Sequence, residues 1–166
     1  MPRTRRDPKS QQTLVAIVGA AIIAAVIGVS FVLMTQATNS ENYVKTIQSI
    51  SDQSRVFTKT YEDSIARWQN DQISKEEMLR ITDSHLENLD KLLTKLKNVE
   101  PPEKFRIAHE LSISSLSHEL QSDRHMRNYI ETGNDNEYEI SVELLQKAFD
   151  YERQAFEEFS RAGKST

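Results

Sequence analysis

The chain has 166 residues, a net charge of −4 and a hydrophobic fraction of 37%. Four glycines and four prolines argue against a turn-rich β architecture, and the absence of cysteine excludes disulfides and thiol chemistry. The length allows one soluble domain beside a short N-terminal segment, and the acidic balance argues against nucleic acid as a partner.

An uncharged stretch of twenty-one residues runs from Leu14 to Met34. As an α-helix it would be about 31 Å long, which matches the hydrocarbon layer of a bilayer. Residues 1–13 carry a net charge of +3, and basic residues beside a membrane helix stay in the cytoplasm. We therefore predict a cytoplasmic tail over 1–13, a transmembrane helix over 14–34 in the cell membrane, and an extracytoplasmic domain over 35–166. A signal peptide cleaved near residues 35–37 is the alternative.

Small residues recur every four positions along the predicted membrane helix, at Ala16, Ala20, Ala24 and Gly28. Such a ridge lets two helix backbones approach closely in lipid, so it is a candidate packing face for a second membrane helix. The alternative is that the ridge reflects only the abundance of Ala and Gly in this stretch. Lipid, and a protein partner or a second copy of the chain, are the partners this segment predicts.

Helical periodicity fills the rest of the chain. Apolar residues at intervals of three, four and seven predict helices over about 40–71, 75–98, 103–132 and 135–161. Ser74 and Glu77 have the spacing of a capping box, with Ile73 and Met78 placed as a hydrophobic staple. Pro101 and Pro102 end the second helix.

The connections between these helices are short. Gly133 is a natural C-terminal cap of the third helix, and Asn134 with Glu137 opens the fourth. Because two to five residues join each pair, neighbouring helices must be antiparallel. The predicted fold is all-α: a single N-terminal transmembrane helix followed by an up-down-up-down four-helix bundle with heptad-like, coiled-coil seams.

Metal and catalytic motifs were sought among the four histidines and the acidic residues. Bundles that bind two iron ions need Glu-x-x-His pairs, and no histidine here has a glutamate three residues before it. No His-x-x-x-His pair and no glycine-rich phosphate loop occurs either. We expect no catalytic residues, no metal and no cofactor, and so a protein that is not an enzyme.

The third helix places polar residues in its apolar seam. His109, Ser112, Asp123 and Arg127 share a face with Phe105, Leu116 and Ile130. Asp123 and Arg127 are four residues apart, a spacing at which they can pair along the helix. The group either holds the helix in register at the margin of the core or lines a polar pocket for a small ligand.

The opposite face of the same helix carries a second, partly apolar strip. Its members are Ile107, Leu111, His118, His125 and Tyr129. A solvated face normally carries fewer large groups, so this strip is a candidate docking surface, which two histidines would make sensitive to pH. Scattered exposed apolar residues are the alternative explanation.

Two functions remain open from the sequence. The first is a non-catalytic single-pass membrane protein whose bundle mediates protein–protein interaction, as an accessory subunit or scaffold of a membrane complex. The second is an extracytoplasmic ligand-sensing module that signals through a partner. At the level of the fold, this layout resembles the exterior four-helix bundles of bacterial chemoreceptors, and that resemblance implies sensing.

Overall fold

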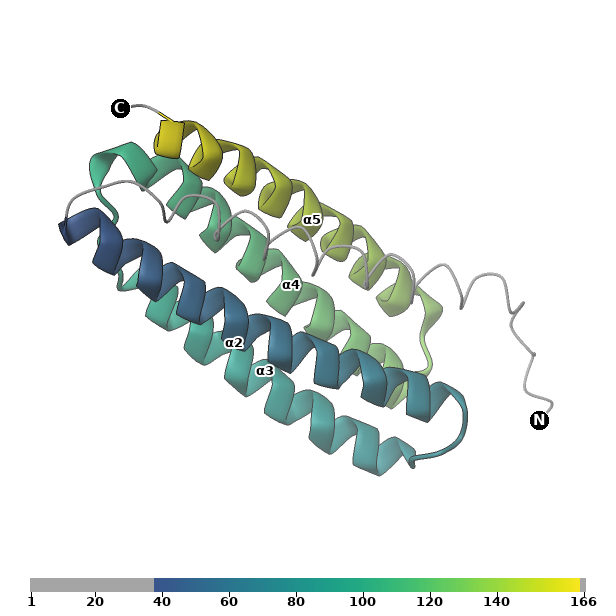
Figure 1. Cartoon of the computed structure of the whole chain (residues 1–166). Helices are drawn as coiled ribbons and strands as arrows, with labels where there is room; N and C mark the ends of the chain where they lie inside the picture. The colour runs from purple at the N-terminus through teal and green to yellow at the C-terminus, as the bar shows by residue number, and fades with distance from the viewer. Residues whose placement is uncertain (1–37, 165–166) are drawn as a thin grey trace.

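The computed structural model describes residues 38–164, which form four long helices and one short 3-10 turn. Their bounds are Thr38–Gln69 for α2, Lys75–Lys97 for α3, Glu103–Phe105 for the turn η1, Arg106–Thr132 for α4 and Asp135–Lys164 for α5. Consecutive helices run in opposite directions (Figure 1). The expected all-α four-helix bundle is confirmed over these residues.

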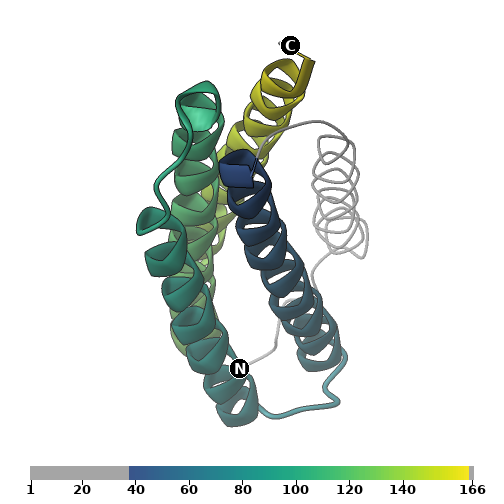
Figure 2. The ribbon, with the colours of Figure 1, turned by 60° about the vertical axis from the view of Figure 1, so that its left-hand side comes forward.

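The two ends of the bundle differ in what they carry. The start of α2, the connection that holds η1 and the end of α5 lie at one end (Figures 1 and 2). The predicted tail 1–13, the predicted membrane helix 14–34 and its ridge of small residues lie outside the described residues. Within residues 38–164, no helix is both long and apolar enough to cross a membrane.

The predicted caps at Ser74 and Gly133 are confirmed, whereas the Asn134 side chain bonds to the Asn136 amide and not to Glu137. The Ser74 hydroxyl accepts a hydrogen bond from the Glu77 amide at 3.1 Å, and Ile73 and Met78 are buried in one cluster. Gly133 ends α4 with a φ of 72°, a left-handed conformation that glycine adopts without strain, and its amide donates to the Tyr129 carbonyl. The helix ends therefore follow from local chemistry.

Helices α4 and α5 approach each other most closely because small residues line both. Ser141, Ala148, Ala155 and Ala162 recur every seven residues on α5 and are all buried. The Ser115 hydroxyl donates to the Ala148 carbonyl at 2.9 Å, and the Ser122 hydroxyl donates to the Ser141 carbonyl at 2.8 Å. Side-chain size at the contact sets the distance between two helices, so this pair is the tightest in the bundle.

The bundle is open between its first and last helices. Among the described residues, no Cα atom of α2 lies within 8 Å of a Cα atom of α5, although α2–α3, α3–α4 and α4–α5 all pack closer than that. Figure 1 shows α4 running behind the space between α2 and α5. The closed bundle that short connections suggest is therefore widened along one side.

This opening changes which residues of α5 are buried. The large apolar stripe of α5 is only partly buried at most positions, whereas Phe159 and the small residues facing α4 are fully buried. The stripe remains partly exposed because α2 does not close over it. Its partly buried members are Tyr138, Val142, Leu145, Phe149 and Phe156.

Candidate functional site

Two cavities lie along the open side of the bundle, between α2 and α5 and over α4. One has a volume of about 130 Å³ and the other about 120 Å³. The first is lined by residues such as Ile50, Leu116 and Phe156, and the second by residues such as Ile65, Met126 and Leu145. Glu119 of α4 lines both, so the cavities are two halves of one groove, which we call the α2–α5 groove.

Most of the surface that lines the α2–α5 groove is apolar, but its ionisable side chains are mainly carboxyl groups. No Lys or Arg is among the residues that line its two cavities. The carboxylates that line them are Glu62, Asp63, Glu119, Asp123 and Glu152. A groove with only negative charge favours a positively charged occupant.

Glu119 lies at the centre of this charge. The Thr58 hydroxyl of α2 donates to its Oε1 atom at 2.8 Å. Burial, and after it the charge of the neighbouring Asp123, raise the pKa of Glu119 to about 7, although the hydrogen bond from Thr58 opposes the shift. The carboxyl group therefore titrates near neutral pH, and its ionised form is destabilised by the low polarity around it.

Two other carboxyl groups of the groove are shifted in the same direction. Burial and the charge of Glu119 raise the pKa of Glu62 to about 7, although Lys59 opposes the shift. Burial and Glu119 likewise raise the pKa of Glu152 to about 7. The Oε1 atom of Glu62 is buried with no hydrogen-bond partner among the described residues, so one acceptor of the groove is left unsatisfied.

A buried polar group stands beside the groove, where residues of α2, α3 and α4 meet. His85 Nε2 lies 3.0 Å from Asp123 Oδ2, and the Tyr61 ring stacks on His85 with centroids 4.2 Å apart. Burial, followed by the charge of Asp123, raises the pKa of Tyr61 well above its ordinary value. This group fixes Asp123 from α3, so the carboxylate at the second cavity is held in one position.

The four predicted seam residues separate into two environments. His109 is buried and its Nδ1 atom lies 3.1 Å from the Tyr43 hydroxyl, while Ser112 and Asp123 line the groove. Arg127 lies at the surface instead, where it pairs with Asp83 and Glu131. Asp123 instead lies against His85 of α3, which reaches it from inside the bundle.

The predicted docking strip is also divided. Ile107 is 58% exposed and Leu111 is partly buried, but the other three members contact neighbouring helices. His118 packs on Tyr151, and His125 bonds to Glu137 at 2.7 Å, both across to α5. Tyr129 packs edge-on against Trp68 of α2 and beside Tyr138 of α5. The strip is thus mostly a margin of the α4–α5 contact rather than one continuous free surface.

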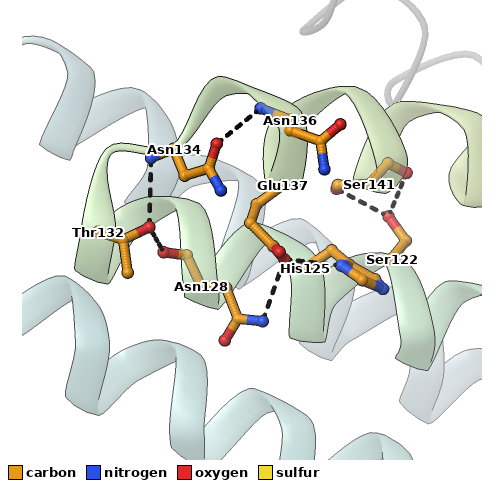
Figure 3. A network of polar contacts seen from close by, with 8 residues as sticks. All are labelled: Ser122, His125, Asn128, Thr132, Asn134, Asn136, Glu137 and Ser141. Carbon is orange, nitrogen blue, oxygen red and sulfur yellow. Dashed lines mark hydrogen bonds and ion pairs between the residues drawn. The ribbon is translucent and has the colours of Figure 1, made fainter.

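Figure 3 shows a network of hydrogen bonds around the α4–α5 turn, in which His125 is the member of the strip that takes part. Glu137 bonds to both His125 and Asn128, and these bonds hold the pKa of Glu137 below its ordinary value. Asn134 accepts from the Asn136 amide, which caps the start of α5. The network orders the connection between α4 and α5 at the end of the bundle farthest from Thr38.

The groove carboxylates were missed at the level of the sequence, although a signal was present. Glu152 follows Phe149 by three residues and precedes Phe156 by four, so it occupies a core position of the α5 stripe. Glu119 stands in the same way between Leu116 and Asp123 on α4. An acidic residue at a core position of the 3–4 repeat, found on two helices, indicates carboxyl groups that lie among the apolar side chains of the core.

Among the described residues, no group of three or more histidine, aspartate or glutamate side chains is placed to hold a metal ion. Compared with known proteins, the chain matches no family model, no curated protein and no solved structure. The α2–α5 groove is therefore the feature on which a functional proposal rests. It combines two apolar cavities with five carboxyl groups.

Proposed function

We propose that this chain is a non-catalytic, single-pass membrane protein whose helical bundle lies outside the cytoplasm and binds another protein, as an accessory subunit or scaffold. The observation that carries the proposal is the α2–α5 groove. Here α2 and α5 stand apart, and two mainly apolar cavities lie between them. Open apolar grooves in helical proteins commonly receive a helix of a partner.

The support for attachment to the membrane is the uncharged, apolar stretch near the N-terminus. Three residues separate the end of the uncharged stretch 14–34 from Thr38, where α2 begins. With residues 14–34 in the bilayer, the end of the bundle that carries Thr38 and the η1 connection stands next to the membrane. The groove then runs away from the membrane surface, where a partner with its own membrane helix can reach it.

Recovery of the full chain from its native membrane in mild detergent tests this function. The expected result is a complex of defined stoichiometry, and replacement of Ala20 and Ala24 by Leu weakens it because the larger side chains hold the membrane helices apart. The matched control replaces Val15 and Val26, outside the ridge, by Leu. Recovery of the protein only as a lone monomer, by native mass spectrometry, would count against the proposed function.

A second candidate function, sensing of a small ligand, is favoured by the size of the two cavities. Each is close to the roughly 150 Å³ cavity that is known to take a benzene ring, so each has room for a small apolar group. A panel of small amines and aromatic compounds should then raise the melting temperature of the full chain. A flat response across the panel would argue against sensing.

A further inference from the structure

We propose that the α2–α5 groove binds an amphipathic helix of the partner protein, with one Lys or Arg of that helix seated on Glu119 between two apolar anchors. This inference rests on the proposed function of the bundle as a protein-binding module and names the surface and the kind of partner. It is carried by the geometry of the groove and by its charge.

The length of the groove fits a short helix. Along α4 the lining residues extend from Ser112 to Met126, which corresponds to about 21 Å of helix. A partner helix of about 14 residues, or four turns, would span the same distance. Large, partly buried side chains on α5, such as Leu145 and Phe156, supply the apolar wall against which its apolar face would pack.

The spacing of the cavities predicts the pattern of the partner. On α4, the first cavity is lined from Ser112 to Glu119 and the second from Glu119 to Met126, so their centres are about seven residues, or 10 Å, apart. Two apolar side chains at positions i and i+7 of a helix have this separation. A cation at i+3 or i+4 would then lie over Glu119.

The charge of the groove selects a cation at that central position. Glu62, Glu119 and Glu152 take part in no ion pair among the described residues, and Glu62 keeps one buried acceptor without a donor. An ammonium or guanidinium group would donate to these oxygens and stabilise their ionised forms. The chain's own stretch 14–34 carries no charge and therefore does not meet this requirement.

Binding of a designed peptide to the full chain in phosphatidylcholine nanodiscs tests the inference. The probe is a fluorescent helical 18-mer with Leu at i and i+7 and Lys at i+4, and the matched peptide has norleucine in place of Lys. We expect the Lys peptide to bind about tenfold more tightly, with its affinity rising from pH 6 to pH 8 as the carboxyl groups ionise.

Two variants locate the binding on the protein. Glu119→Gln keeps the acceptor for Thr58 but removes the charge, and should weaken binding of the Lys peptide about tenfold while leaving the norleucine peptide unaffected. Glu139→Gln, on the exposed face of α5, is the control and should change neither. Melting curves of both variants establish that they are folded.

Several outcomes would overturn the inference. The first two are equal affinity of the two peptides and no binding of the Lys peptide. The last two are full competition by free spermine at matched charge, and a dimer of the unliganded chain that the Glu119→Gln substitution dissociates. The last two would assign the groove to a free amine or to a second copy. Each leaves the membrane pull-down experiment standing, whereas a lone monomer in that experiment would count against the proposed function itself.

Discussion

Glu119 shows how the position of one residue in the fold sets its ionisation. Its position in the apolar repeat of α4 brings it into the groove, and its hydrogen bond from Thr58 ties α4 to α2. Its ionised form is poorly solvated there, so its pKa is raised to about 7. A group of this kind makes the stability of the bundle depend on pH in the neutral range.

The sign of that dependence follows from linkage. The ordinary pKa of a glutamate is 4.5, so between pH 4.5 and 7 the folded protein holds a proton on Glu119 that the unfolded chain releases. The contribution of Glu119 to the free energy of unfolding is therefore complete below about pH 4.5 and is lost as the pH rises to 7. Glu62 and Glu152 act in the same direction.

Replacement of Glu119 by Gln should remove this contribution. We expect the variant to melt about 5 °C above the wild type at pH 8 and to show little or no advantage at pH 5. Burial lowers the pKa of His109, which opposes the trend in both proteins and so cancels in their difference. Circular dichroism melts at pH 5, 6, 7 and 8 measure the effect, and a constant difference between the proteins at all four pH values would contradict it.

At the scale of the helix, small residues decide which pair packs most closely. The heptad of Ser141, Ala148, Ala155 and Ala162 fits against Ala108, Ser115 and Ser122 of α4, and hydroxyl groups of α4 bond to carbonyl groups of α5. With α5 held against α4 in this way, its large apolar stripe is turned toward the side where α2 stands away. The groove is therefore a consequence of the α4–α5 contact.

Enlarging one of these small residues should separate the two helices. Ala148→Leu adds a branched side chain where the Ala148 carbonyl already lies 2.9 Å from the Ser115 hydroxyl. The expected loss in the free energy of unfolding is about 1 to 3 kcal/mol, measured by urea denaturation. Lys147→Leu, at an exposed position one residue earlier, is the matched control. Equal stability of the two variants would mean that α4 and α5 are not tightly packed at this point.

At the scale of the molecule, the open side can be tested with cysteine pairs, because the natural chain has no cysteine. Ser122→Cys with Ser141→Cys joins two side chains whose oxygen atoms are 3.1 Å apart, and this pair should form a disulfide in mild oxidant. Ser54→Cys with Phe156→Cys bridges the groove, where Cα atoms are more than 8 Å apart, so it should stay reduced. Non-reducing gels report both, and equal oxidation of the second pair would show that the groove closes.

The sequence by itself determined the helices and their ends. Ser74 and Gly133 act through hydrogen bonds to neighbours in the chain. Pro101 and Pro102 act through their missing amide hydrogens, so all of these effects are readable without the fold. The apolar repeats of three and four residues likewise predicted the bundle. The same local reading placed His109, Ser112 and Asp123 on one face, where the structure finds them within or beside the core.

Only the tertiary structure decided where that bundle is open. The opening between α2 and α5 depends on how closely the small side chains let α4 and α5 pack. That contact joins residues on different helices, so the periodicity of one helix could not reveal it. For the same reason Asp123 pairs with His85 of α3 rather than with Arg127. The raised pKa of Glu62, Glu119 and Glu152 also needed the fold, since burial is the largest cause of each shift and the charge of Glu119 reaches Glu62 and Glu152 from another helix.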